Sequence, residues 1–269
     1  MSDQRIFRLP GNRRFRDLQC PVAFLAPISP VAATHEGVTR HRMGMAQQIN
    51  VDEPFGAVLG VNSGVPAYSC DYETWRVPKG EREWRHTHEG VLTGYKWQCV
   101  EYARRWLLVN RGVTFGDVGM AYEIMDLKTV TVQTPGPRKG TELPLYRCEN
   151  GGPVPPVAGA MLIWGRDWDR TGHVAIITEV VPGKAMKVRI AEQNNEDWKW
   201  AAGNDYAREM PLEFKDGRYT IVEPEGFSVL GWMVQAEHDP NFPEDEEARG
   251  SGGPVASGSS PVASTKPVT

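Results

Sequence analysis

The residues best suited to chemistry in this sequence are a cysteine, a histidine and a short polar run, which follow one another in that order. Cys99 begins a stretch in which apolar side chains recur at helical spacing, at Val100, Ala103, Trp106 and Leu107. The first turn of a helix presents unpaired backbone N–H groups and the positive end of the helix dipole, and both stabilise a thiolate. Cys99 is therefore a candidate nucleophile.

A thiolate nucleophile needs a base, and His173 is the histidine best placed to be one. It follows the turn residues Thr171 and Gly172 and begins the apolar segment 173–179, which is predicted to be a β-strand. The start of a strand is a rigid mount from which a ring can face a cleft. The sequence thus predicts a Cys99–His173 pair of the kind that thiol hydrolases use.

A third group usually orients the histidine in such a site. The next predicted strand, 187–192, ends in Glu-Gln-Asn-Asn, in which Glu192 and Asn194 are two residues apart and so point to one face. This strand is expected to pair with the strand that carries His173. Either side chain could orient the imidazole, and the sequence does not choose between them.

Each of these signals also has an ordinary structural interpretation. A lone cysteine is more often simply buried, a histidine that begins a strand is often solvated, and a polar run after a strand is often a turn. His86 and His88 offer a rival zinc site, but no further ligands lie at suitable spacing. No metal site is predicted, and because no phosphate-binding glycine motif occurs, no cofactor is predicted.

The elements that must position these residues are predicted to be helices followed by strands. A helix begins at Cys99 and a second short helix is expected at 122–127, whereas 132–158 is rich in Pro and Gly and is expected to be mostly loop. Strands with short, Gly-containing connections are predicted at 160–164, 173–179, 187–192, 219–222 and 229–234. This order favours an α+β fold in which N-terminal helices pack on an antiparallel sheet.

Composition divides the chain of 269 residues into three parts. Residues 1–50 are predicted to be an irregular extension, 51–238 the folded domain, and 239–269 a disordered tail that is first acidic and then rich in Pro, Gly and Ser. The net charge of −4, without a basic stripe, argues against a nucleic-acid partner. No apolar run is long enough to predict a membrane span, so no membrane partner is expected.

Cysteine usage bears on the compartment. Four scattered cysteines without a Cys-x-x-Cys pair are typical of a reducing environment, so a cytoplasmic location is predicted. The arginines between residues 5 and 16 and the weakly apolar 21–33 resemble a targeting peptide, but acidic residues and prolines interrupt both.

Three motifs together resemble the CHAP family of cysteine- and histidine-dependent amidohydrolases/peptidases. They are Trp-Gln-Cys-Val-Glu-Tyr-Ala-Arg-Arg at 97–105, Gly-His-Val-Ala-Ile-Ile at 172–177 and Ile-Ala-Glu-Gln-Asn at 190–194. A further stretch, Asp-Val-Gly-Met-Ala at 117–121, is similar to the glutathionylspermidine amidase domains within that family. The resemblance implies a papain-like CHAP domain.

By this resemblance Cys99 is the nucleophile, His173 the base and the Glu192/Asn194 pair the orienting position. The residues implied to bind the substrate, which is a small peptide-like or glutathione–polyamine molecule, are Gln98, Arg104, Val118, Gly119, Met120, Ala121 and Asn194. The implied activity is thiol-dependent hydrolysis of glutathionylspermidine-type conjugates to glutathione and polyamine through a Cys acyl-enzyme. The alternatives are a D-alanyl-glycyl peptidoglycan endopeptidase and a catalytically silent CHAP binding module.

Overall fold

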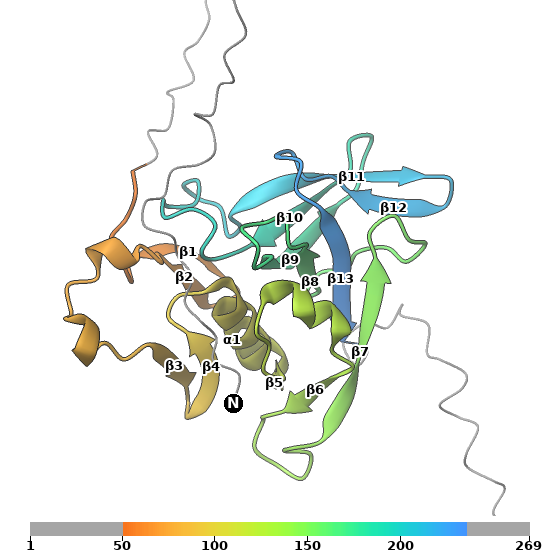
Figure 1. The fold of residues 1–269 in the computed structure, drawn as a ribbon. Coiled ribbons are helices and arrows are strands. Elements are labelled where there is room, and N and C mark those ends of the chain that lie inside the picture. Colours follow the sequence, from red (N-terminus) through yellow and green to blue (C-terminus); the bar gives the residue numbers. More distant parts are fainter. Residues whose placement is uncertain (1–50, 236–269) are drawn as a thin grey trace, which may run out of the picture.

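Strands dominate the fold of residues 51–235, the part of the chain that the computed structural model describes (Figure 1). The first half holds β1 (Val58–Asn62), β2 (Val65–Tyr68), the 3-10 helices η1 (Tyr72–Thr74) and η2 (Lys79–Glu81), β3 (Arg85–His88), β4 (Val91–Tyr95), α1 (Cys99–Arg111), β5 (Val113–Phe115), the 3-10 helix η3 (Ala121–Asp126) and β6 (Thr129–Val132). The second half holds β7 (Glu142–Glu149), β8 (Met161–Trp164), β9 (Val174–Val181), β10 (Lys187–Ala191), β11 (Arg208–Lys215), β12 (Arg218–Ile221) and β13 (Val229–Gln235).

Nine of these strands form one antiparallel sheet, in the order β12-β11-β10-β9-β8-β13-β7-β6-β5. Two separate hairpins, β1–β2 and β3–β4, precede it in the chain. The predicted extension 1–50 and tail 239–269 lie outside the described residues. Between residues 51 and 235, no helix has the length and apolar character that crossing a membrane requires.

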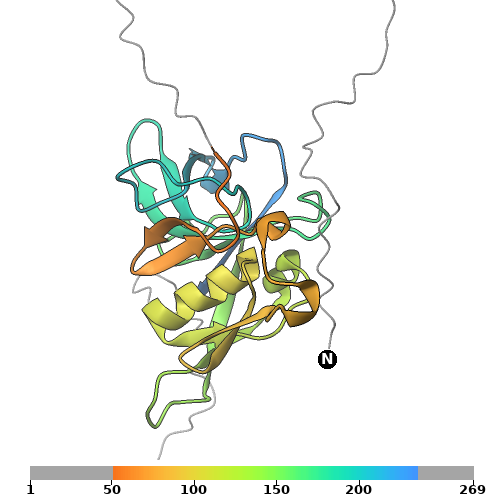
Figure 2. The same cartoon turned by 90° about the vertical axis from the view of Figure 1, so that its left-hand side faces the viewer.

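Helix α1 begins at Cys99, as the apolar periodicity predicts, and it buries Ala103, Trp106 and Leu107 of the predicted stripe. It ends at Arg111, and the capping residue Gly112 has a left-handed backbone (φ 67°) that lets its N–H reach the carbonyl oxygens of the last turn. The helix packs against β9, β5, β4 and β2. Figure 2 shows α1 in yellow beside the β1–β2 hairpin in orange.

The large sheet has an apolar core on each side, because alternate residues of its strands point in opposite directions. Met161 and Ile163 of β8 join the core that α1 covers, whereas Leu162 and Trp164 join the second core. Tyr219 of β12 forms a β-bridge with Gly152, which follows β7. The part of the sheet that runs from β7 through β13, β8, β9, β10 and β11 to β12 therefore curls around the second core.

The observed elements correct several predictions. N-terminal helices packed on the sheet are not confirmed, because α1 is the single α-helix among residues 51–235 and the expected helix at 122–127 is the 3-10 helix η3. The fold is α+β or mostly β. The segment 132–158 is mostly loop, as predicted, but it also contains the unpredicted strand β7, and β11 was not predicted at all. Pro144 and Pro211 weaken the strand signal of β7 and β11.

The doubly buried position of β8 generates a prediction about stability. Leu162→Ala should lower the free energy of unfolding by about 2–5 kcal/mol, because it leaves a cavity in the second core. Leu92→Ala, at a side chain that is 44% exposed, is the matched control and should change it by less than about 0.5 kcal/mol. Urea unfolding followed by circular dichroism measures both. Equal effects of the two substitutions would contradict the described packing.

Candidate active site

Cys99 occupies the first position of α1, where the helix begins against the sheet. The residue before it, Gln98, has extended backbone and its side chain does not cap the helix. The first N–H groups of a helix have no partner within the helix, so they point to the space in front of the thiol. Cys99 is 7% exposed. Its position is the one that the sequence predicts for a nucleophile.

His173 immediately precedes β9 and is held there by backbone contacts. Its carbonyl oxygen accepts a hydrogen bond of 2.9 Å from the N–H of Trp164, which extends the β8–β9 pairing. The preceding Gly172 has φ 69°, and a Cβ there would lie 2.7 Å from the Trp164 carbonyl oxygen. Only glycine fits this close approach, so the turn in front of β9 fixes the backbone position of His173 and with it the origin of the side chain.

The structure brings the three predicted groups together inside the protein. His173 Nε2 lies 2.9 Å from Glu192 Oε2, and Cys99 lies near enough to the same ring to raise its pKa. Burial by itself lowers the pKa of His173, but the hydrogen bonds and charges of Cys99 and Glu192 outweigh it and raise the pKa to about 9. The arrangement therefore favours a positively charged imidazolium beside the thiol.

Glu192 directly follows β10 and is 4% exposed. Burial raises the pKa of its carboxyl group, but Arg208 and His173 lower it to about 2, so the group is a carboxylate. Arg208 Nε donates to Glu192 Oε1 at 2.7 Å, and Asn195 Nδ2 donates to the same oxygen at 3.0 Å. All of these contacts hold the carboxylate against the histidine.

Asn194, the other orienting candidate, contacts a different residue. Its Nδ2 donates to Gln98 Oε1 at 2.9 Å. The Gln98 amide nitrogen donates in turn to the Tyr72 hydroxyl at 2.9 Å and faces Cys70 Sγ at 3.5 Å. Of the pair that the sequence left open, Glu192 contacts His173, whereas Asn194 fixes the side chain that precedes the nucleophile.

Two tryptophans that the sequence analysis did not single out enclose the imidazole. Trp168 stacks on His173 with ring centroids 4.8 Å apart and planes at 16°, and Trp164 lies 5.2 Å away at 59°. These contacts set the plane of the ring. Neither these residues nor Arg208 stand in a motif, so no pattern in the sequence indicated them.

The other predicted substrate-binding residues fall into two groups. Arg104 is 5% exposed and donates to the backbone oxygens of Thr93, Phe115 and Gly116 at 2.8, 3.1 and 2.9 Å. These contacts describe a structural role, and a contact with substrate stays a prediction.

The segment 118–121 lies close to the histidine. Glu123 accepts hydrogen bonds from the N–H groups of Gly119 and Met120 at 2.7 and 3.1 Å, and the Ala121 N–H donates to Thr171 at 2.9 Å. Val118 and Ala121 are buried. The segment is therefore bound to Thr171, which lies two residues before His173 in the chain. In this position it can form a wall of the site.

A second buried polar cluster ties α1 to the residues after β10. Glu101, which is fully buried, accepts hydrogen bonds from Arg105 (2.8 Å), Thr93 (2.9 Å) and Gln193 (3.0 Å), and lies 2.8 Å from His86 Nδ1. Burial raises the pKa of Glu101, but His86 and Arg105 lower it to about 2. Because Gln193 stands between the two orienting candidates, this cluster sets their position relative to Cys99.

The rival metal site gains no ligand cluster. His86 uses Nδ1 toward Glu101 and Thr93. Across 51–235, no three His, Cys, Asp or Glu side chains gather closely enough to hold a metal ion.

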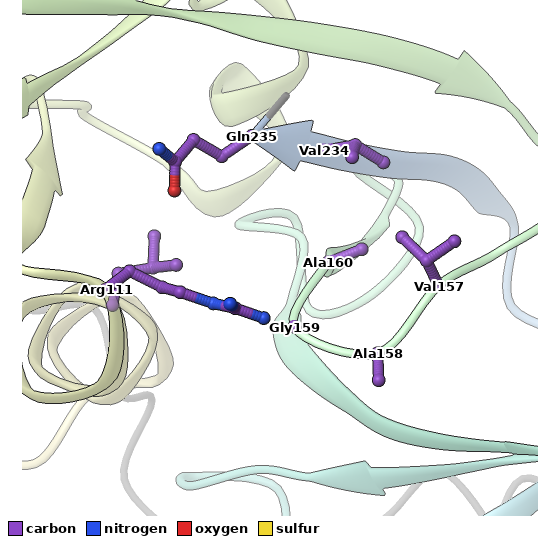
Figure 3. Close-up of a pocket in the computed structure, with 8 residues that line it drawn as sticks. Arg111, Val157, Ala158, Gly159, Ala160, Val234 and Gln235 are labelled. Atoms are coloured by element: carbon purple, nitrogen blue, oxygen red, sulfur yellow. The ribbon is translucent and has the colours of Figure 1, made fainter. Parts of the chain in front are cut away.

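A small pocket lies at the other end of the helix (Figure 3). It is lined by Leu107 and Arg111 of α1, by 157–160 and by Val234 and Gln235. Cys99 and Arg111 are the first and last residues of α1, so the pocket is ~18 Å along the helix from the thiol. It is separate from the candidate active site.

Comparison with known proteins identifies a family for the part of the chain that contains Cys99 and His173. A buried cysteine at a helix start, near a histidine that contacts a carboxylate, has the residue types that nucleophilic catalysis at a carbonyl carbon requires. Residues 90–194 match the family model described as CHAP domain, and the chain therefore carries a CHAP domain.

Three relatives extend the similarity beyond the matched segment. The bifunctional glutathionylspermidine synthetase/amidase of Escherichia coli (strain K12) is 42% identical over 192 residues, which cover 69% of this chain and 30% of that protein. The trypanothione synthetase of Crithidia fasciculata is 36% identical over 71% of this chain and 28% of the relative. The glutathionylspermidine synthase of the same organism is 32% identical over 82% of this chain and 31% of that protein. The chain thus spans about 30% of the length of these relatives.

The contacts of His173 predict its titration. The ring should keep its second proton as pH rises to about 9, because Cys99 and Glu192 stabilise the charged form. Glu192→Gln removes the carboxylate charge and should lower the midpoint by at least about one pH unit. Nitrogen-detected NMR of the imidazole measures both. Glu179→Gln, at an exposed ion pair of β9, should leave the midpoint unchanged. A wild-type midpoint near the ordinary 6.5 would contradict the described contacts.

Proposed function

We propose that this domain hydrolyses the amide bond of glutathionylspermidine-type conjugates, releasing glutathione and the polyamine. The observation that carries the proposal is the buried group of Cys99, His173 and Glu192, in which Glu192 contacts His173 at 2.9 Å and Cys99 helps to raise the pKa of the same ring. A thiolate beside an imidazolium attacks acyl carbons, and a carboxylate holds the imidazolium in place. The substrate class is inferred from the relatives, one of which is named a glutathionylspermidine synthetase/amidase.

The proposed reaction has two halves. The Cys99 sulfur attacks the amide carbon, and the unpaired N–H groups at the start of α1 stabilise the oxyanion. The C–N bond then breaks, the leaving amine takes a proton from His173, and the glutathionyl group remains as a thioester. In the second half His173 takes a proton from water, which attacks the thioester, and the free thiol and the carboxylic acid are released.

The surroundings of Cys99 suggest how the acyl part is bound. Gln98, fixed by Asn194, borders the thiol on one side. The segment 118–121, fixed by Glu123 and Thr171, borders the histidine. We assign both to the wall that holds the glutathionyl group. In this scheme the contacts of Arg104 with 115–116 support the approach to that wall, and its guanidinium, whose Nη2 also lies 3.9 Å from Asp117 Oδ1, is the cation proposed to attract a substrate carboxylate.

A peptidoglycan endopeptidase and a silent binding module remain as rival interpretations, and two observations disfavour them. The similarity at 42% identity extends over 192 residues, well beyond the three motifs, and leads to an amidase of the conjugate. The complete set of contacts around His173 disfavours a silent module. We expect the reaction to take place in the cytoplasm, because a reducing compartment preserves a thiol nucleophile.

Removing the thiol tests the mechanism. The protein should release spermidine from glutathionylspermidine, and Cys99→Ala should lower the rate by roughly 10³-fold or more, because no acyl-enzyme can form. Mass spectrometry of the products measures this release.

Cys148→Ala, at an equally buried cysteine of β7, should keep the activity and is the matched control. Gly-bridged peptidoglycan serves as the second substrate. Cleavage of peptidoglycan alone would replace the proposal with the endopeptidase, and cleavage of neither would favour the silent module.

A second experiment separates the roles of Asn194 and Glu192. Asn194 has φ 62°, a conformation that glycine adopts freely, so Asn194→Gly keeps the backbone and removes only the amide that holds Gln98. We expect kcat/KM to fall about tenfold, as for the loss of one hydrogen bond, with the titration of His173 unchanged. Glu192→Gln should instead lower both kcat and the titration midpoint. The reverse pattern would make Asn194 the orienting residue.

A further inference from the structure

We propose that Arg208 is a positioning residue for this site, which together with Glu223 holds the Glu192 carboxylate in the orientation and charge state that His173 requires. The inference rests on the proposed function, since it assigns a role within the same reaction. Arg208 is the first residue of β11, on the far side of Glu192 from the histidine. No motif of the sequence includes it.

The two oxygens of Glu192 are divided between the two cations. Arg208 Nε donates to Oε1 at 2.7 Å, while Oε2 lies 2.9 Å from His173 Nε2. Each oxygen of the carboxylate therefore has its own partner, and these two contacts restrict rotation of the group. A hydrogen bond from an arginine to a carboxylate is directional as well as strong. By holding Oε1, Arg208 therefore sets the angle at which Oε2 of Glu192 meets the imidazole.

Arg208 is itself fixed from behind. Its Nη1 donates to both oxygens of Glu223, at 3.0 and 3.2 Å, and the Glu223 side chain is 1% exposed. The indole N–H of Trp164 donates to Glu223 Oε2 at 2.8 Å. The chain of contacts from Trp164 through Glu223 and Arg208 thus ends on Glu192.

The same two indoles contact both the arginine and the histidine. Arg208 Cζ lies 5.5 Å from the centre of the Trp164 ring and 5.8 Å from that of Trp168. Both rings also pack on His173. A shift of Arg208 would therefore move the surroundings of the base as well as its carboxylate partner.

The energetics favour a functional explanation of this cluster. Two carboxylates are removed from water, and although the Arg208 side chain is 24% exposed, its Nη2 is buried without a hydrogen-bond partner within residues 51–235. Buried ion pairs of this kind often stabilise a fold no better than apolar side chains of the same volume. Charged clusters that are retained in this way gather at functional sites, and this one ends on the candidate base.

The charge balance predicts what the loss of Arg208 does. The charged or titratable groups around Glu192 are Arg208 of β11, His173 before β9, and Tyr102 and Cys99 of α1, with Glu223 behind Arg208. Without Arg208, Glu223 loses the cation that it pairs with, and Glu192 keeps His173 as its ion-pair partner. The pKa of Glu192 must then rise, because its main attractive charge is gone. Once protonated, Glu192 no longer stabilises the imidazolium.

The experiment follows the reactivity of Cys99 itself, which requires no substrate. Alkylation by iodoacetamide is measured between pH 5 and 9 by mass spectrometry of the Cys99 peptide, beside hydrolysis of glutathionylspermidine. In Arg208→Met the acid limb of the alkylation profile should move up by about one pH unit, which corresponds to a tenfold slower reaction on that limb. Arg208→Lys keeps the charge but loses the fork, so its acid limb should stay in place while hydrolysis slows about tenfold.

Arg189→Met removes a half-buried arginine of β10 that pairs with Glu179 and Glu209, away from Glu192, and it is the matched control. Its alkylation profile should equal that of the wild type. A folded Arg208→Met protein with an unmoved acid limb would overturn the proposal. If that variant does not fold, Arg208→Lys decides: slower hydrolysis supports the proposal and wild-type hydrolysis overturns it.

Failure of the proposed function is distinguishable from failure of this inference. If the wild type hydrolyses neither conjugate nor peptidoglycan, the alkylation profile of Arg208→Met still tests the positioning role. If hydrolysis proceeds and the profile is unmoved, only the role of Arg208 is wrong.

Discussion

The contact between His173 and Glu192 is the interaction on which the rest of this structure depends. Both side chains are almost completely buried, and an isolated charge in such a place is strongly unfavourable. The imidazolium and the carboxylate are tolerated because each is the partner of the other, and because Cys99 and Arg208 extend the pairing at either end. The four groups come from α1, β9, β10 and β11 or their ends. The domain must therefore hold three neighbouring strands and one helix in fixed positions relative to one another.

Two features fix these positions. The β8–β9 and β9–β10 pairings determine where His173 and Glu192 lie relative to each other, since each residue adjoins the end of a paired strand. The buried Glu101 cluster then determines where Cys99 lies relative to both, because Gln193 donates to Glu101 and also to the Gln98 carbonyl oxygen. The helix that carries the nucleophile is thus anchored by polar contacts at Gln98 and Glu101, on either side of Cys99, and by apolar contacts further along.

The two ends of α1 have different roles, because the site lies at its start and apolar packing lies along the rest of the helix. The helix buries Trp106 and Leu107 against the sheet and ends in an ordinary glycine cap, far from the thiol. Folds host many activities, and function belongs to the site rather than to the architecture. In this chain the polar contacts at the start of α1 carry the chemical argument, and the apolar contacts along the rest of the helix carry the stability.

The sequence by itself determined the start of α1, the candidate pair Cys99 and His173, and the strands that adjoin His173 and Glu192, because all of these depend on local periodicity and turn residues. Only the tertiary structure decided that Glu192 contacts His173 while Asn194 turns to Gln98, since that choice depends on a left-handed backbone at Asn194 and on the pairing of β9 with β10. It also placed Trp168 and Arg208 at the site and committed three donors of Arg104 to backbone oxygens. These contacts join residues far apart in the chain, and a sequence pattern records spacing along the chain but not which side chains meet across it.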